Sequence, residues 1–324
     1  MRIAILDDYQ DAVRTLTCFA KLNEHEVAVF NDHERDPAQL AERLKDFDAL
    51  VLIQQRCPLP RAVIEQLPRL RLISQTGRNA SHIDVAAATE RGVVVSAGGA
   101  GNPTAPAELT WALILAALRH IPKEVEALKR GRWQLTLGTG LSGRVLGVYA
   151  FGKIGSRVAD VGRAFGMRVL CFGREASTAR ARAAGFDVVR SRQEFFQSCD
   201  VLSLHLPLSA ETRGIVTASD LAQMKSSALL VNTSRAGLIG DAVLIEALRN
   251  GRPGFAAVDV YDDEPVVGGA HPLLKMENVL CAPHLGYVEH DTYEMYLGAA
   301  FDQVNAYAAG RPINVVNPAA LERR

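Results

Sequence analysis

The stretch "YAFGKIGSRVA" (residues 149–159) joins an apolar run to a helical segment through two glycines. Gly152 and Gly155 fill the last two positions of the pattern G-x-G-x-x-G, and Ala150 stands in the first. In that pattern the second glycine lets the backbone approach a pyrophosphate, and the third lets the helix pack on the strand. The stretch predicts a strand–turn–helix unit that binds a dinucleotide through backbone amides of Gly152, Lys153, Ile154 and Gly155. The alternative is a glycine-rich turn without a ligand.

Apolar, β-branched runs like the one before this turn recur in two series along the chain. The first series is 2–6, 27–30, 49–53, 70–74 and 93–96; the second is 145–151, 168–172, 200–206, 228–234, 255–260 and 279–283. Continuous runs, rather than alternating ones, are typical of parallel strands that are buried on both faces. We therefore predict an α/β fold with two Rossmann-like or flavodoxin-like domains, each built on a parallel sheet.

A Gly/Pro-rich segment and a strongly apolar helix separate the two series. The helix is expected from about Ala107 to His120, and because it is apolar nearly all round from Trp111 to Leu118, we expect it to be buried on every side. It is either an ordinary core helix or a helix shared with a second subunit. The loop-like "LKRGRWQLTLGTG" that follows carries an exposed-looking Trp133 and favours the second reading. We expect a homodimer.

The second strand of the dinucleotide unit, "RVLCF" (168–172), ends without the usual acid. An Asp or Glu at this place binds the ribose 2′-hydroxyl of NAD and repels a 2′-phosphate. Here Gly173 and Arg174 follow the strand. An open glycine beside a guanidinium suits a 2′-phosphate, so we expect NADP as the preferred cofactor. The alternative is NAD, with Glu175 as a substitute acid.

Three polar residues follow three successive predicted strands. "VNTSRAG" places Arg235, "DVYDDEP" places Glu264 and "APHLG" places His284. Ligands of open α/β sheets bind beyond the carboxyl ends of the strands. Hydride transfer to a 2-keto acid needs such a trio: a cation for the substrate carboxylate, a proton donor for the carbonyl oxygen, and an acid that holds the imidazole. The alternatives are a surface ion pair, a solvated acidic run and a loop histidine.

Composition excludes several other classes. Lys+Arg and Asp+Glu are both 36 in 324 residues, so neither a nucleic acid nor an anionic membrane is an expected partner. The longest apolar run, 109–118, is too short to span a bilayer. The five cysteines are scattered without a CxxC pair, which indicates reduced thiols in a cytoplasmic protein and no metal site.

Taken together, the motifs resemble the D-isomer-specific 2-hydroxyacid dehydrogenase family. The resemblance rests on "AFGKIG", "CDVLSLHLPLSAETRGIV", "LLVNTSRAGLI", "AAVDVYDDEPV" and "NVLCAPHLGY", in this order and at similar spacing. It implies a discontinuous substrate-binding domain from 1–101 and 287–324, a dinucleotide-binding Rossmann domain from 102–286, a cleft that closes over the substrate, and a homodimer formed by the nucleotide domains.

The resemblance also implies roles for individual residues. Arg235, Glu264 and His284 take the catalytic roles given above. Leu206, Pro207 and Thr233 would line the cofactor, Asp259 would face the nicotinamide amide, and Gly286 would lie close to the ring. The loop "TGRNASHID" (76–84) would bind the substrate carboxylate through backbone amides around Arg78 and Asn79. Its two side chains depart from the usual Gly-x-Gly-x-Asp run, so Arg78 is either a second cation for a dicarboxylate or solvent-exposed.

We therefore expect an oxidoreductase that reduces glyoxylate, hydroxypyruvate or a similar 2-keto acid to the D-2-hydroxy acid. Two alternatives remain open. Transcriptional corepressors that sense dinucleotides share the scaffold and the trio, although this chain shows no extra recognition segment. Phosphite oxidation is also compatible with the trio, whereas formate oxidation is disfavoured because the formate enzymes carry Gln at the place of Glu264.

Overall fold

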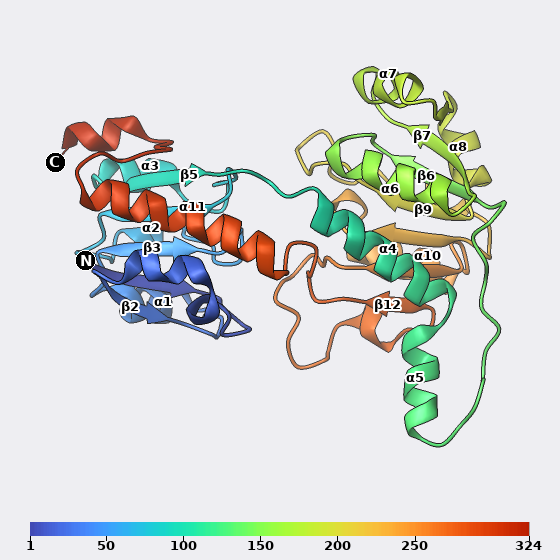
Figure 1. The fold of residues 1–324 in the computed structure, drawn as a ribbon, viewed down its shortest axis with the longest axis horizontal. Coiled ribbons are helices and arrows are strands. Elements are labelled where there is room, and N and C mark those ends of the chain that lie inside the picture. The colour runs from blue at the N-terminus through green and yellow to red at the C-terminus, as the bar shows by residue number, and fades with distance from the viewer. Residues whose placement is uncertain (324) are drawn as a thin grey trace. The chain divides into compact units, whose positions relative to one another are not determined.

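The computed structural model of the chain describes residues 1–323 and divides them into two compact units. Among these, unit 1 comprises residues 1–101 and 289–323, and unit 2 comprises residues 102–288 (Figure 1). Each unit contains one parallel sheet flanked by helices, which confirms the predicted α/β class.

Unit 1 is built on a five-stranded sheet in the order β2-β1-β3-β4-β5. The strands are β1 (Arg2–Leu6), β2 (Glu26–Val29), β3 (Ala49–Leu52), β4 (Leu72–Thr76) and β5 (Val94–Gly98). The helices are η1 (Val13–Thr15), η2 (Thr17–Leu22), α1 (Pro37–Leu44), α2 (Arg61–Ile64), α3 (Val85–Glu90), α11 (His290–Ala308) and η5 (Pro318–Arg323).

Both faces of the unit 1 sheet are covered, as continuous apolar strands require. Apolar side chains of α1, α2 and α3 pack with Leu50 and Ile73 on one face. On the other face the Ser74 hydroxyl donates to Ala300 O of α11 (2.8 Å), and Gln303 of the same helix donates to Ser74 Oγ (2.9 Å). The last helix of the chain therefore belongs to the unit formed by the first hundred residues.

Unit 2 is built on a seven-stranded sheet in the order β12-β11-β10-β9-β6-β7-β8. The strands are β6 (Val145–Tyr149), β7 (Arg168–Phe172), β8 (Asp187–Val188), β9 (Val201–Leu204), β10 (Leu229–Asn232), β11 (Phe255–Val258) and β12 (Val279–Cys281). The helices are α4 (Thr104–Leu118), α5 (Ile121–Lys129), α6 (Lys153–Ala164), α7 (Glu175–Ala183), α8 (Arg192–Ser198), α9 (Ala218–Ala222), η3 (Ala236–Leu238), α10 (Asp241–Arg249) and η4 (Pro272–Lys275).

The sheet of unit 2 reverses its strand order at β6. From β6 the chain moves outward to β7 and β8, then returns to β9 on the other side of β6 and continues to β12. Helices α4 and α6 pack on one face with Trp111 and Val158, and helices α8, α9 and α10 pack on the other with Phe195 and Leu244. A doubly wound sheet of this kind binds ligands where the order reverses, at the carboxyl ends of β6 and β9.

The observed strands are mostly shorter than the apolar runs that predicted them. For example, 145–151 becomes β6 and 200–206 becomes β9, because each run continues into the turn beyond the strand. The two-residue edge strand β8 was not predicted, since Asp187 and Val188 form no apolar run.

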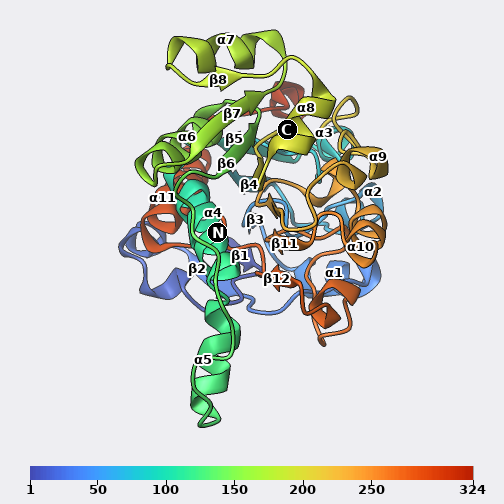
Figure 2. The same ribbon diagram turned by 90° about the vertical axis from the view of Figure 1, so that its right-hand side faces the viewer.

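The expectation that the helix after the crossing segment is buried on every side is wrong for this chain. Helix α4 buries Trp111 and Ile114, but Glu108 and Ala112 are exposed. Figure 2 shows α5 and the chain after it extending away from the sheet of unit 2. This extension carries Trp133, which is 74% exposed, and Leu137, which is 94% exposed.

Candidate active site

The glycine turn between β6 and α6 is open where a phosphate would approach and closed where the helix packs. A Cβ on Gly152 would meet no atom within 4 Å, whereas a Cβ on Gly155 would collide with the carbonyl oxygen of Ala150. Gly152 precedes the first turn of α6, so amides of Lys153 and Ile154 lie at the positive end of a helix. Ala150 has a φ of 77°, a left-handed conformation that its methyl group tolerates poorly.

Helix α7 holds this turn in place. Phe151 N donates to Ser177 Oγ (2.6 Å), and the guanidinium of Arg180 donates to Phe151 O from two nitrogens (3.1 and 3.2 Å). Gly173 has a φ of 156°, and a Cβ there would lie 3.2 Å from Ser177 Oγ. The backbone conformation and the nearby Ser177 hydroxyl thus favour glycine at position 173, in addition to the space that a glycine leaves for a cofactor phosphate. Sequence patterns gave no signal for Ser177 or Arg180.

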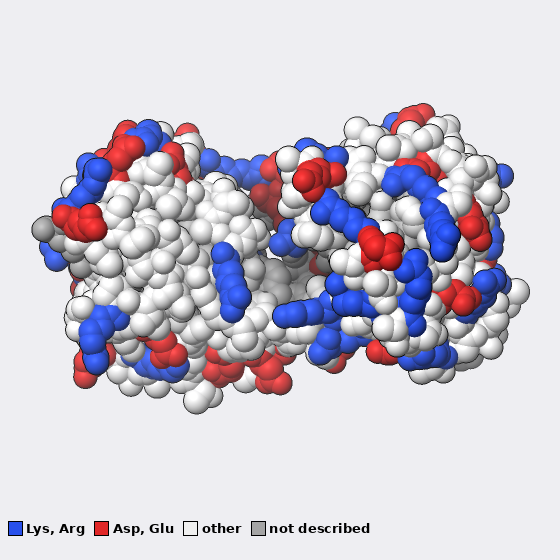
Figure 3. All heavy atoms as spheres, turned by 90° about the horizontal axis from the view of Figure 1, so that it is seen from above, with Lys and Arg blue, Asp and Glu red and all other residues white. Residues whose placement is uncertain are grey.

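The side chains after Gly173 form two separate ion pairs. Arg174 Nη2 lies 2.5 Å from Glu211 Oε2, a carboxylate from the loop after β9. Glu175 pairs instead with Arg182 on its own helix (2.9 Å). Figure 3, which views the protein from the side of α7, shows Lys and Arg atoms gathered over unit 2 with acidic atoms among them.

The residues expected to line the cofactor follow β9 and β10. Leu206 is half-buried against the core, and the carbonyl of the exposed Pro207 accepts from Thr212 Oγ1 (2.6 Å). The Thr233 hydroxyl lies 2.7 Å from that of Thr110, so helix α4 fixes the end of β10. Thr110 was not predicted, because a threonine inside an apolar helix resembles an ordinary core residue.

His284 and Glu264 are in direct contact. His284 Nδ1 lies 2.6 Å from Glu264 Oε2, and Tyr261 N donates to Glu264 Oε1 (2.9 Å). The carboxylate is held through both oxygens, and it fixes the edge of the imidazole that carries Nδ1. A histidine held through Nδ1 in this way can exchange a proton with a ligand through its other nitrogen, Nε2.

Asp259 is fully buried and holds the backbone that follows His284. Its carboxylate accepts from Leu285 N (2.7 Å) and Gly286 N (2.9 Å). Burial raises the pKa of Asp259 to about 6, although the amide of Leu285 and the nearby His284 act in the opposite direction. The structure therefore shows Asp259 as the anchor of the His284 loop, a contact that the sequence did not predict.

Arg235 is the residue before the 3-10 turn η3, three positions after the end of β10. Its Nη1 donates to Ser234 O (2.7 Å), and Asn232 Nδ2 donates to Arg235 O (3.0 Å). Strands β10, β11 and β12 are neighbours in the sheet, so Arg235, Glu264 and His284 follow adjacent strand ends as predicted. Of these three side chains, the structure joins Glu264 and His284 by a direct contact.

Arg78 and Asn79 lie in unit 1, in the loop after β4. Both are exposed, and Asn79 Oδ1 accepts from Ser81 N (3.0 Å), a bond that shapes the loop. Gly77 has a φ of 77°, which a glycine adopts without strain.

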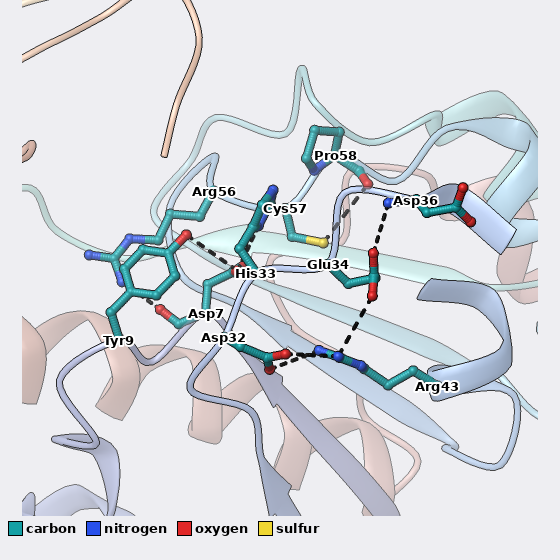
Figure 4. A network of polar contacts seen from close by, with 10 residues as sticks. All are labelled: Asp7, Tyr9, Asp32, His33, Glu34, Asp36, Arg43, Arg56, Cys57 and Pro58. Carbon is teal, nitrogen blue, oxygen red and sulfur yellow. Dashed lines mark hydrogen bonds and ion pairs between the residues drawn. The ribbon is translucent and has the colours of Figure 1, made fainter. Parts of the chain in front are cut away.

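A second polar cluster lies at the same carboxyl edge of the unit 1 sheet, and sequence reasoning missed it. Asp7, after β1, is buried beside His33 (Oδ1 to Nδ1, 2.8 Å), as Figure 4 shows. Arg56 donates to Asp7 O (2.6 Å) and lies over the ring of Tyr9. Burial raises the pKa of Asp7, and its contacts with His33 oppose this effect. The cluster joins the loops after β1, β2 and β3.

Fold and site together define a dinucleotide-binding α/β oxidoreductase with a histidine–carboxylate pair. The sequence profile of the D-isomer specific 2-hydroxyacid dehydrogenase, NAD binding domain, matches residues 111–286. The chain is 35% identical to the glyoxylate reductase of Aeropyrum pernix, over 93% of this chain and 92% of that protein. It belongs to the D-isomer specific 2-hydroxyacid dehydrogenase family, whose nucleotide-binding domain takes NAD.

Two solved structures are similar over nearly the whole chain. One is a phosphoglycerate oxidoreductase from Vibrio cholerae, 51% identical, covering 96% of this chain and 99% of that one with a TM-score of 0.92. The other is the D-lactate dehydrogenase of Aquifex aeolicus complexed with NAD and lactic acid, 26% identical, covering 97% and 99% with a TM-score of 0.75. Among residues 1–323, no helix combines the length and the apolar character needed to cross a bilayer.

Proposed function

We propose that this protein reduces a small 2-keto acid of the glyoxylate or hydroxypyruvate type to the D-2-hydroxy acid. The observation that carries the proposal is the His284–Glu264 pair at the end of β12, on the sheet whose glycine turn leaves space above Gly152. When bound, the nicotinamide cofactor supplies the hydride.

Each catalytic side chain has one task in this proposal. Arg235 binds the substrate carboxylate and polarises its carbonyl group. His284 gives a proton from Nε2 to the carbonyl oxygen and takes it back in the reverse direction. Glu264 holds the imidazole through Nδ1 and stabilises its charged form. Asp259 fixes the backbone at Leu285 and Gly286, and so the place from which His284 acts.

Unit 1 would supply the remaining substrate contacts. We propose that backbone amides of the loop around Arg78 and Asn79 meet the substrate carboxylate, and that the exposed Arg78 side chain favours substrates with an additional anionic group. This assigns residues 1–101 and 287–324 to substrate binding and residues 102–286 to the dinucleotide.

We propose NADP as the preferred cofactor. Gly173 takes the place of the usual acid directly after β7, and the exposed side chain of Arg174, which pairs with Glu211, follows it. Leu206, Pro207 and Thr233 would line the bound cofactor. Asp259 and Gly286, the other two residues expected at the nicotinamide, are both buried and joined by a hydrogen bond (2.9 Å), so they would shape its site through the His284 loop rather than by direct contact.

The decisive experiment compares initial rates of glyoxylate and hydroxypyruvate reduction with NADPH and NADH. A kcat/KM at least tenfold higher with NADPH supports the cofactor assignment, and an equal or lower value contradicts it. Phosphohydroxypyruvate and pyruvate test the substrate classes that the names of similar structures suggest. Tight dinucleotide binding with no turnover of any 2-keto acid would contradict the proposed reductase activity and favour a dinucleotide sensor. Reduction of NAD(P) that depends on phosphite would favour phosphite oxidation as the activity.

We also propose a homodimer that forms through α5 and the extension after it. This segment presents Leu128 (57% exposed), Trp133 and Leu137 on the single chain. Several large apolar side chains on one protruding segment are typical of an interface rather than of a solvated surface.

The five free cysteines, four of them buried, fit the reducing environment of the cytoplasm, where we place the protein.

A further inference from the structure

The Arg174–Glu211 ion pair links the two loops that flank the glycine turn. Arg174 follows β7 and Glu211 lies in the loop after β9, while β6, which leads into the turn, lies between these two strands. The distance between Arg174 Nη2 and Glu211 Oε2 is 2.5 Å. The pair therefore joins the loops that follow the two strands flanking β6, at the edge of a doubly wound sheet where a cofactor binds.

Glu211 stands on a fixed turn, although its own side chain is exposed. Thr212 is buried, its hydroxyl donates to Pro207 O (2.6 Å), and it accepts from Ser209 N (2.8 Å). Further along, Gly214 N donates to Gly237 O (2.8 Å). The loop backbone therefore presents the carboxylate of Glu211 at a defined place, next to the guanidinium of Arg174.

The pair is weak enough to exchange partners. The side chains of Arg174 and Glu211 are 72% and 74% exposed, and an ion pair in water contributes little to stability. The planar guanidinium of Arg174 can donate to two oxygens of a phosphate, which carries more negative charge than one carboxylate. Glu211, in contrast, would repel any phosphate that reached the same guanidinium.

We propose that Glu211 is a specificity-determining residue of the cofactor site, which competes with the 2′-phosphate of NADP(H) for the guanidinium of Arg174. With NAD(H), which lacks this phosphate, the pair stays closed. With NADP(H), Arg174 exchanges Glu211 for the phosphate. The inference rests on the proposed placement of the adenosine end of the cofactor beside Arg174, and it makes the preference for NADP(H) smaller than Arg174 alone would give.

The test measures binding to the full-length protein, without turnover. Adenosine 2′,5′-bisphosphate and AMP serve as probes in calorimetric titrations at constant ionic strength. Glu211→Gln should tighten the bisphosphate about three- to tenfold and leave AMP within twofold. Arg174→Ala should weaken binding of the bisphosphate. In the Arg174→Ala protein, Glu211→Gln should have no further effect on this binding, because the competition requires both side chains.

Asp187→Asn is the matched control, since Asp187 forms an exposed ion pair with Arg168 (2.9 Å) on the same sheet. It removes one negative charge from unit 2 without touching Arg174. If both variants bind the bisphosphate more tightly by the same factor, the effect comes from net charge and the proposal is overturned. The proposal is also overturned if Glu211→Gln leaves the affinity for the bisphosphate unchanged. Weaker AMP binding in Glu211→Gln would also overturn it, because Glu211 would then bind the ribose.

Failure of the proposed function gives a different result. If the wild-type protein binds AMP as tightly as the bisphosphate, the NADP preference is wrong, yet selective tightening by Glu211→Gln still supports the competition. If the wild-type protein prefers the bisphosphate and Glu211→Gln changes nothing, the cofactor assignment stands and the role of Glu211 is wrong. Melting temperatures of the variants verify that each is folded.

Discussion

The imidazole of His284 and the carboxylate of Glu264 lie 2.6 Å apart, between Nδ1 and Oε2, although 20 residues separate them in the chain. The second oxygen of Glu264 is bound by the amide of Tyr261. His284 itself has a φ of 53°, in the left-handed region that residues other than glycine rarely adopt. Backbone and carboxylate together orient the ring, which is what a residue that transfers protons requires.

The first prediction concerns this pair. Glu264→Gln should lower kcat for 2-keto acid reduction about 10- to 100-fold, because the neutral glutamine side chain cannot stabilise a charged imidazole as the carboxylate does. His284→Gln should lower kcat about 100- to 10,000-fold, the usual contribution of a general acid. Steady-state rates with saturating cofactor measure both effects.

Cofactor affinity is the control for these two variants. Neither side chain belongs to the glycine turn, so the dissociation constant of the dinucleotide should stay within threefold of the wild-type value. A His284→Gln variant that keeps more than a tenth of the wild-type kcat would remove His284 from the chemistry.

The second prediction follows from the burial of Asp259. Its pKa in the folded protein, about 6, lies above the ordinary value of 3.8. The folded state thus binds more protons than the unfolded state between these values, and stability falls as the pH rises from about 4 to about 6. The cost of ionisation above pH 6 is about 3 kcal/mol.

Asp259→Asn removes this ionisation. The variant should be less stable than the wild-type protein at every pH. Its side-chain NH2 group faces a backbone N–H from which the carboxylate accepted a hydrogen bond. Relative to the wild-type protein, it should therefore be more destabilised at pH 4.5 than at pH 7.5. Calorimetric melting at both values measures the difference. Thr110→Val, which changes no titrating group, should show a constant difference, and the same constancy in Asp259→Asn would contradict a raised pKa.

Much of the fold could be predicted from the apolar runs in the sequence, because a strand that is buried on both faces has apolar side chains at successive positions. The positions of Arg235, Glu264 and His284 also follow, since strand ends on one edge of a parallel sheet gather polar residues. Contacts between loops do not follow in this way. Ser177 beside Phe151, Glu211 beside Arg174 and His33 beside Asp7 depend on where chain segments far apart in sequence meet.

The third prediction tests the proposed dimer. Leu137→Asp places a charge on the most exposed of the apolar side chains after α5. If this segment is covered by a second subunit, the buried charge should shift the protein from dimer to monomer in sedimentation or light scattering. Leu321→Asp, an exposed apolar site outside the segment, should leave the mass unchanged. A wild-type protein that is monomeric at micromolar concentration would contradict the proposal directly.

The last prediction separates the two glycines of the turn. Gly152 has a φ of −103° and open space around its Cα, so Gly152→Ala should fold with unchanged or slightly higher stability. The added methyl group nevertheless occupies the space through which a pyrophosphate approaches the backbone, and dinucleotide affinity should fall at least tenfold. Gly155→Ala differs, because its methyl group meets the carbonyl of Ala150 and separates α6 from the strand. It should destabilise the protein by about 1–3 kcal/mol. Thermal melting and cofactor titration of both variants measure the contrast. A Gly152→Ala variant with wild-type affinity would show that the dinucleotide does not bind over this turn, and a Gly155→Ala variant with wild-type stability would show that the helix does not need this close approach.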